Sequence, residues 1–288
     1  MRVFTRVSAT PVIRSHTINI RSLRPSNTSS RRPLVLIQGW TLPPGLTHTP
    51  SFRWSSSVAM AQAPQDSVSI LKQYTACDIS DALLRLKVPG AGYLADIDPY
   101  NQPEGPDAPI TIAPASTVLF APKGVILEQP AKNIPSDANW SDVTEPGTIA
   151  ILRQPDGQKN AVCGGIMALR MKVRGVQGIV AVGRVRDLDE LRSTGLPIWA
   201  RGRSTVGAGA GSIPWAVQVP LEVDGTIVNP GDLVFCDPAN GVVIIPQDKV
   251  DEVVDLLPKL TSADDRVKED VAGGMSVHEA FKTHRGKL

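Results

Sequence analysis

A short run of consecutive apolar residues, 179–182, most constrains how this chain can fold. The run does not alternate with polar residues, which is typical of a strand covered on both faces. A helical segment at 166–174 precedes it, and a second at 188–194 separates it from an extended segment at 197–200. Each helical segment ends at a glycine, a common helix terminator. The order helix, strand, helix, strand predicts an α/β fold.

Charged residues follow this buried strand directly, where α/β proteins usually place their chemistry. Arg186 can offer a bidentate fork to a carboxylate or keto oxygen, and Asp187 offers the hard oxygen that magnesium or manganese prefers. Upstream, Gly164-Gly165 opens the first helical segment. The free N–H groups and positive dipole of such a helix start suit an anionic ligand.

A structural interpretation of the same residues stays open. Asp187 with Glu190 three residues later is also the pattern of an ordinary helix-capping pair, and acid-x-x-acid is common at helix starts. Arg186 could likewise pair with a neighbouring acid at the surface. Spacing alone does not decide between a site and a cap.

Several motifs, in order over residues 68–270, carry a family resemblance. The sequence resembles the family that contains 4-hydroxy-4-methyl-2-oxoglutarate aldolase and the bacterial regulator of ribonuclease activity A. The matching segments are Gly164-Gly165-Ile-Met, Gly183-Arg-Val-Arg186-Asp187-Leu, Gly195-Leu-Pro-Ile-Trp-Ala-Arg-Gly202, Thr75-Ala-Cys-Asp-Ile-Ser-Asp81, Val228-Asn-Pro-Gly-Asp232 and Asn240-Gly-Val-Val-Ile-Ile-Pro246.

The resemblance implies a layered β/β/α swivelling-type domain, assembled as a homotrimer or homohexamer with sites near subunit boundaries. It implies a divalent-metal-dependent class II lyase that uses Mg²⁺, Mn²⁺ or another divalent cation and acts on a small 2-oxo acid. By position, Arg186 is the catalytic and substrate-binding arginine, and Asp187 is the metal ligand. The substrate's carboxylate is held by the backbone of Gly164, Gly165, Ile166 and Met167.

One position departs from the family pattern. The family commonly has an aspartate twenty-one residues before the arginine, and this chain has Gly165 there. Without this acid, the family pattern does not predict the metal affinity or the substrate choice of this chain.

Two functions of different classes therefore follow from the resemblance. The first is cleavage of 4-hydroxy-4-methyl-2-oxoglutarate, or a related 4-hydroxy-2-oxo acid, to pyruvate. Oxaloacetate decarboxylation passes through the same pyruvate enolate, whose negative charge the site must stabilise. The alternative is a non-catalytic protein-binding regulator, like the ribonuclease-regulating members of the family.

The general base is not identified by the sequence. Histidines occur only at positions 16, 48, 278 and 284, which disfavours a histidine base or a multi-histidine metal site in the core. A metal-associated water or a carboxylate is expected instead. Asp81 and Asp237 are conceivable participants, but each is expected to be a helix or turn residue.

Covalent mechanisms are disfavoured. A Schiff-base aldolase needs a lysine in an apolar setting, and neither Lys123 nor Lys172 has one. Cys163 precedes the glycine turn but has no histidine partner, so we expect a small buried filler. Gly207-Ala-Gly209-Ala-Gly211 lacks the lysine and following helix of a nucleotide loop, and predicts a flexible loop at a rim or interface.

The amino-terminal segment differs from the rest. The first 65 residues hold eight arginines and neither lysine nor acid, which is typical of a mitochondrial transit peptide. Residues 1–60 are therefore expected to be a transit peptide or disordered leader, and 66–288 the aldolase-like domain. A start at Met60 would instead give a cytoplasmic protein.

Composition limits the partners of residues 66–288. This segment holds 22 Lys and Arg against 28 Asp and Glu, which disfavours a nucleic-acid surface. The chain has no run of 18 apolar residues, so a membrane span is not expected. Three cysteines without paired spacing fit a reducing compartment.

Two further elements are expected from local patterns. An amphipathic helix is expected from residue 250 to Gly273-Gly274, and a turn-rich connector at 103–109.

Overall fold

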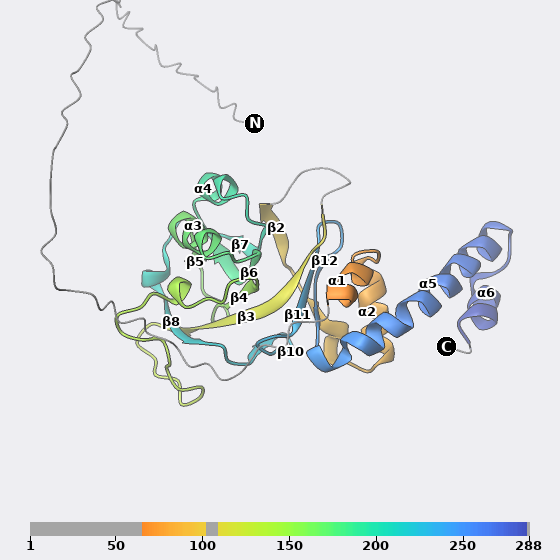
Figure 1. Ribbon diagram of the computed structural model, residues 1–288, viewed down its shortest axis with the longest axis horizontal. Coiled ribbons are helices and arrows are strands. Elements are labelled where there is room, and N and C mark those ends of the chain that lie inside the picture. Colours follow the sequence, from red (N-terminus) through yellow and green to blue (C-terminus); the bar gives the residue numbers. More distant parts are fainter. Residues whose placement is uncertain (1–64, 102–108, 287–288) are drawn as a thin grey trace, which may run out of the picture. The chain divides into compact units, whose positions relative to one another are not determined.

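One long strand, β3 (Thr111–Pro122), joins the two halves of a large mixed sheet in the computed structural model, which describes residues 65–101 and 109–286 (Figure 1). In one half, β3, β4, β6 and β7 run parallel in that order. Strand β2 pairs with β7, β8 pairs with β3, and β5 pairs with the end of β6. In the other half, β11, β12 and β1 continue from β3 in antiparallel pairs. The remaining strands of this mixed sheet are β1 (Tyr93–Leu94), β2 (Asp98–Asn101), β4 (Ile149–Arg153), β5 (Ala161–Cys163), β6 (Gly178–Val185), β7 (Ile198–Arg203), β8 (Ser212–Val217), β11 (Leu233–Asp237) and β12 (Gly241–Ile245).

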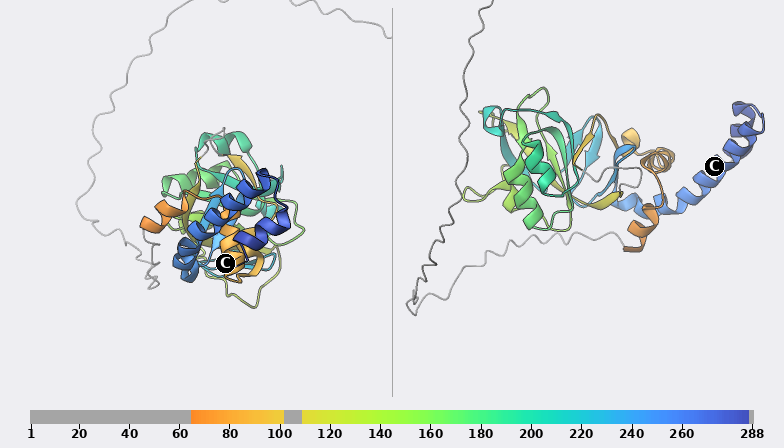
Figure 2. Two further views of the ribbon diagram at one scale, coloured as in Figure 1. Left: turned by 90° about the vertical axis from the view of Figure 1, so that its right-hand side faces the viewer. Right: turned by 90° about the horizontal axis from the view of Figure 1, so that it is seen from above.

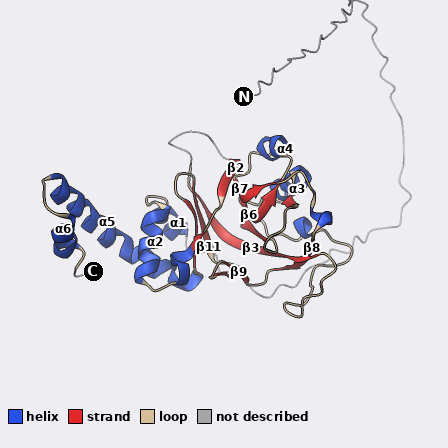
Figure 3. Ribbon diagram, turned by 180° about the vertical axis from the view of Figure 1, so that it is seen from behind, coloured by secondary structure: helices blue, strands red, loops and turns tan. Residues whose placement is uncertain are grey.

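The sheet halves pack face to face and carry helices on their outer faces (Figure 3). The central core joins apolar side chains of β4, β6 and β7 to those of β11, β12 and the small hairpin β9–β10. Helices α3 and α4 cover the first half, and α1, α2 and α5 cover the second. These elements are β9 (Leu221–Val223), β10 (Thr226–Val228), α1 (Gln65–Leu71), α2 (Ala76–Arg85), α3 (Gly165–Val173), α4 (Leu188–Ser193) and α5 (Val250–Ala272).

This architecture confirms the expected α/β class with layered sheets. The apolar run at 179–182 lies in β6, where every residue from Gly178 to Gly183 is buried, as expected for a strand covered on both faces. The predicted helices on either side of it are α3 and α4, and the extended segment that follows is β7. Sequence order therefore brings the ends of β5 and β6 to the starts of α3 and α4.

The predicted C-terminal helix is α5, which ends at Gly273 and is followed by α6 (Val277–His284). The inner face of α5 buries apolar residues at helical spacing, from Val250 through Leu257 to Val267. Only the part of α5 as far as Leu260 packs against the core of the second half, and the rest of α5 projects with α6 as a helical arm (Figure 2). Short 3₁₀ turns complete the chain at η1 (Pro89–Gly92), η2 (Trp140–Asp142), η3 (Ala208–Ala210) and η4 (Gln247–Lys249).

Two expectations fall largely or wholly outside the described residues. These are the leader at 1–60 and the connector at 103–109, of which only residue 109 is described. Within the described parts of the chain, no helix combines the length and apolar character needed to cross a lipid bilayer.

Asp237 has a structural role at the end of β11. Its buried carboxylate accepts hydrogen bonds from the backbone N–H of Ala76 at 2.9 Å, the N–H of Ala239 at 2.9 Å and the side-chain amide of Asn240 at 2.7 Å. It thereby satisfies the first N–H group of α2. Helix α2 and helices α3 and α4 lie on opposite sides of the sheets (Figure 1). The structural role expected of Asp237 is therefore found, but Asp237 is the last residue of a strand, β11, and not a helix or turn residue as expected.

Replacing Asp237 with alanine should lower the free energy of unfolding by about 2–3 kcal/mol, because buried donors lose a charged acceptor. Urea unfolding monitored by circular dichroism measures the change. The control is Asp248→Ala, whose side chain is 78% exposed, and which should change stability by less than about 0.5 kcal/mol. Equal effects of the two substitutions would contradict this role for Asp237.

Candidate functional site

Arg186 and Asp187 lie where β6 ends. The backbone N–H of Arg186 donates to the carbonyl of Cys163 at 3.0 Å, which ties this end of β6 to the end of β5. Asp187 then adopts a left-handed conformation, with φ 57° and ψ 50°. Aspartate tolerates this region better than most residues, and such conformations cluster at functional sites. The turn directs the chain from β6 into α4.

The Gly164-Gly165 turn lies directly against these two side chains. Oδ2 of Asp187 accepts from the backbone N–H of Gly165 at 3.4 Å and lies 3.2 Å from Nε of Arg186. A Cβ atom on Gly164 would stand only 2.5 Å from the same Oδ2. Glycine is therefore required at position 164 for the carboxylate to approach the start of α3.

The predicted substrate-binding residues are partly brought together. Gly164 and Gly165 meet Arg186 and Asp187, as described above. Ile166 and Met167 occupy the first turn of α3, where N–H groups have no partner within the helix. The side chain of Ile166 is 73% exposed, whereas Met167 packs against the core beneath the helix. Any contribution of these two residues to anion binding therefore comes from their backbone.

Glu190 also lies at the candidate site, although the sequence interpretation did not include it. A Cβ atom on Gly165 would lie 1.9 Å from Oε2 of Glu190 and 2.5 Å from its Cβ. The Glu190 side chain thus occupies the space that an aspartate at position 165 would need. This chain places a carboxylate there from α4 instead of α3. The available signal was the Asp187-x-x-Glu190 spacing, which had suggested only a helix cap.

The helix-capping interpretation of Asp187 is wrong. Asp187 occupies the N-cap position of α4, but its side chain makes no capping hydrogen bond to that helix. The carboxylate turns instead toward the start of α3. The pairing of Arg186 with a neighbouring acid does occur, and the acid is Asp187 itself. Both side chains remain partly accessible, with 42% of Arg186 and 38% of Asp187 exposed.

The residues considered for covalent chemistry lack a suitable setting. Burial, together with the negative charge of Asp187, raises the pKa of the Cys163 thiol to about 12, so the nucleophilic thiolate is disfavoured. Lys172 is exposed on α3. Lys123 is exposed too, and donates from Nζ to the carbonyl of Gly209 at 2.8 Å. These positions agree with the expectation that Cys163 is a buried filler and that neither lysine is in an apolar setting.

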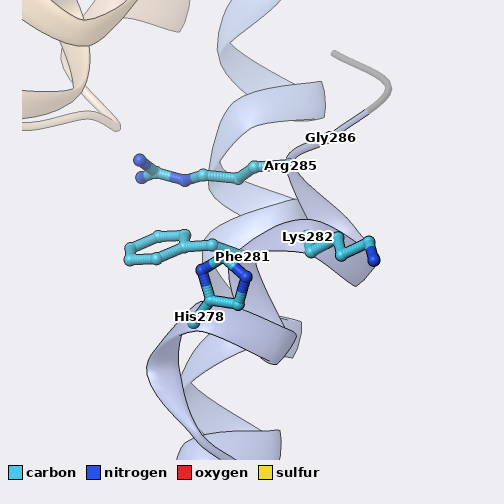
Figure 4. Close-up of a pocket in the computed structure, with 5 residues that line it drawn as sticks. All are labelled: His278, Phe281, Lys282, Arg285 and Gly286. Atoms are coloured by element: carbon cyan, nitrogen blue, oxygen red, sulfur yellow. The ribbon is translucent and has the colours of Figure 1, made fainter.

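The titratable residues of the C-terminal arm are engaged elsewhere. Arg285 pairs with Asp264 and lies 3.6 Å from Asp81. Asp81 lies within α2 and is therefore a helix residue, as expected. A shallow hollow on α6 is lined by His278, Phe281, Lys282, Arg285 and Gly286 (Figure 4). The Arg285 guanidinium lies 5.0 Å from the Phe281 ring centre, in cation–π contact. No carboxylate faces this hollow among its lining residues, so it does not resemble the site at α3 and α4.

The donor set at α3 and α4 fits a hard divalent cation. Asp187 and Glu190 supply carboxylate oxygens against consecutive residues of one turn. Magnesium is usually bound through one or two carboxylates and keeps several water ligands. Among the described residues, no group of three or more His, Cys, Asp or Glu side chains could hold a metal ion. A closed, all-protein cage of the structural zinc type is therefore not present in that part of the chain.

Fold and site together define an α/β protein with a charged site at the ends of parallel strands. The sequence profile of the RraA-like family, described as Aldolase/RraA, matches residues 76–244. This match spans more than half of the chain, and the chain belongs to the RraA-like family. The residues of the candidate site lie within the matched region.

Curated relatives are distant. Protein DlpA of Legionella pneumophila is 28% identical over 216 residues, which are 74% of this chain and 33% of DlpA. Protein MJ0644 of Methanocaldococcus jannaschii is 28% identical over 123 residues, 43% of this chain and 58% of that protein. This chain therefore spans a third of the first and little more than half of the second. A Halalkalibacterium halodurans protein, provisionally named 4-hydroxy-4-methyl-2-oxoglutarate aldolase, is 27% identical over 73% of this chain and 90% of its own length.

Solved structures share the fold. An uncharacterized protein of Pseudomonas syringae pv. tomato is 27% identical, with a TM-score of 0.59 over 75% of this chain and 97% of its own. RraAS2 of Streptomyces coelicolor, an unusual member of the RNase ES inhibitor RraA family, is 26% identical. Its TM-score is 0.57 over 74% of this chain and 98% of its own.

Crowding between position 165 and Glu190 can be measured directly. Gly165→Ala should lower the free energy of unfolding by about 1–3 kcal/mol, because the Glu190 side chain must move away from the new methyl group. In the Glu190→Ala background the same substitution should cost at least about 1 kcal/mol less. Chemical denaturation of the four proteins completes the double-mutant cycle. An equal penalty in both backgrounds would contradict the close approach of Glu190.

Proposed function

We propose that this chain is a divalent-metal-dependent carbon–carbon lyase that releases pyruvate from 4-hydroxy-4-methyl-2-oxoglutarate or a related 4-hydroxy-2-oxo acid. The observation that carries the proposal is the convergence of Asp187, Glu190 and Arg186 on the Gly164-Gly165 turn. The provisional name of the Halalkalibacterium relative supports it. Glu190 supplies the acid whose absence at position 165 set this chain apart from the family pattern.

The protein groups each have a role in this chemistry. Asp187 and Glu190 would hold the cation, which when bound polarises the substrate's keto oxygen as a Lewis acid. The N–H groups of Ile166 and Met167 in the first turn of α3 bind the substrate's carboxylate with the help of the helix dipole, whereas that of Gly165 donates to Asp187. Arg186 donates to the keto oxygen as cleavage of the C3–C4 bond leaves negative charge there. The buried thiol of Cys163 stays protonated and takes no part.

Oxaloacetate is proposed as a second substrate of the same site. Loss of its distal carboxylate as carbon dioxide leaves the same pyruvate enolate, so the same charge develops on the keto oxygen. Decarboxylation releases no alcohol proton and therefore needs no base for that step. A residue that acts only as the aldolase base would affect cleavage of the hydroxy acid but not decarboxylation.

The charge on Asp187 should be essential for turnover. Asp187→Asn keeps a residue that tolerates the left-handed conformation, but should lower metal-dependent pyruvate release at least about 100-fold. The assay couples pyruvate to lactate dehydrogenase, with each substrate and with Mg²⁺ or Mn²⁺. The matched control is Asp189→Asn in the same helix, because that side chain is fully exposed. Turnover that is absent from the wild type with every metal, or unaffected by Asp187→Asn, would refute the proposal.

A protein-binding regulator remains the alternative function. It is favoured by the likeness to RraAS2, whose family is named for inhibition of RNase ES. A regulator need not release pyruvate, and a lyase need not bind a ribonuclease. The turnover assay therefore separates the two functions.

We further propose that the chain forms a homo-oligomer through α3. Ile166, Leu169 and Val173 are 73%, 56% and 69% exposed and lie along one face of this helix. An apolar stripe on a helix is more often buried, and a second copy of the chain would cover it. Because α3 also begins at the candidate site, this interface would place the site near a subunit boundary.

A charge in the stripe should weaken this assembly. Leu169→Glu should shift the particle to a smaller mass in light scattering coupled to size exclusion, because a carboxylate would be buried in the interface. Gln177→Glu, just before β6, adds the same charge outside the stripe and should leave the mass unchanged. A monomeric wild type, or an oligomer unaffected by Leu169→Glu, would contradict the proposed interface.

A further inference from the structure

The loop between β7 and β8 packs against the guanidinium of Arg186. A Cβ atom on Gly207 would lie 2.8 Å from Nη1 of Arg186 and 3.3 Å from Cζ. Real Cβ contacts are not found at the first of these distances, so any side chain at position 207 would displace the guanidinium. Gly207 thus lies at the far end of Arg186, whereas Asp187 contacts its Nε.

The backbone on both sides of Gly207 is fixed. The carbonyl of Val206 accepts from the N–H of Ala161 at 2.7 Å, and that of Ala208 accepts from the side-chain amide of Asn160 at 3.4 Å. Asn160 is itself buried and donates to the hydroxyl of Ser212 at 2.9 Å. These bonds hold the loop to Asn160 and to the first residue of β5, so the loop cannot easily move away from Arg186.

Gly207 needs no special backbone freedom. Its φ of −75° and ψ of 164° are open to any residue. The requirement for glycine at this position is therefore one of space beside Arg186. A mobile loop was expected from the sequence at 207–211, but the segment from Val206 to Gly211 is hydrogen-bonded and includes the short turn η3.

We infer that Gly207 is a positioning residue, which sets where the Arg186 guanidinium meets the substrate's keto oxygen. The inference rests on the proposed lyase function. The guanidinium of Arg186 has Asp187 beside Nε, and beside Nη1 it has the space that a Cβ atom on Gly207 would need. A methyl group at position 207 would displace the Arg186 guanidinium from the substrate's keto oxygen. A displacement of about 1 Å can lower the rate on the order of a hundredfold.

The test compares two alanine substitutions in the same loop. Gly207→Ala should lower kcat/KM for oxaloacetate about 10- to 100-fold while leaving the thermal unfolding temperature unchanged or slightly raised. Gly209→Ala is the matched control, because a Cβ there meets nothing within 4 Å. It should retain wild-type kinetics. In an Arg186→Ala background, Gly207→Ala should have no further effect on the residual rate, because the displaced group is gone.

Crystal structures of the wild type and both variants give a readout that does not depend on turnover. The Arg186 guanidinium should be displaced in Gly207→Ala and unmoved in Gly209→Ala. An unmoved guanidinium, or wild-type kinetics in Gly207→Ala when the wild type is active, would overturn the inference. A wild type without activity would refute the lyase proposal, and the position of the guanidinium would then decide whether Gly207 positions it.

Discussion

Burial of the parallel strands on both faces is the constraint on which the rest of this structure depends. Every residue of β4 and nearly every residue of β6 is withdrawn from solvent, so these strands contribute little polar chemistry along most of their length. Charged groups are confined to the strand ends and the turns that follow them. Arg186 and Asp187 are the first two residues after β6, and both side chains are partly exposed to solvent.

The site then depends on how closely charged side chains approach the backbone. Two consecutive glycines admit the carboxylates of Asp187 and Glu190, and a third glycine at position 207 admits the guanidinium of Arg186. A single methyl group at any of these three glycines would prevent the close approach of the charged side chain. Small residues at three positions therefore determine where the charges lie, although they carry no functional group themselves.

The fold class and the Arg-Asp pair could be predicted from sequence because they rest on local patterns. An unbroken apolar run, glycine-terminated helices and a short charged motif are visible without a structure. Glu190 could not be placed, because its spacing to Asp187 equally suits a helix cap. The contact between Gly207 and Arg186 depends on the path of the β7–β8 loop, which no local pattern specifies. Likewise, the sequence did not predict that α1, α2 and α5 pack together over the second half of the sheet.

The long strand β3 also affects the order in which the chain can assemble. Its partner β4 begins at Ile149, but its other partners β8 and β11 begin only at Ser212 and Leu233. During synthesis on the ribosome, more than a hundred residues after the end of β3 must therefore be added before β11 exists to pair with it. An unpaired strand edge is a template for pairing with other chains. The nascent protein thus carries an aggregation-prone edge through much of its translation, and completion of the sheet is a late event.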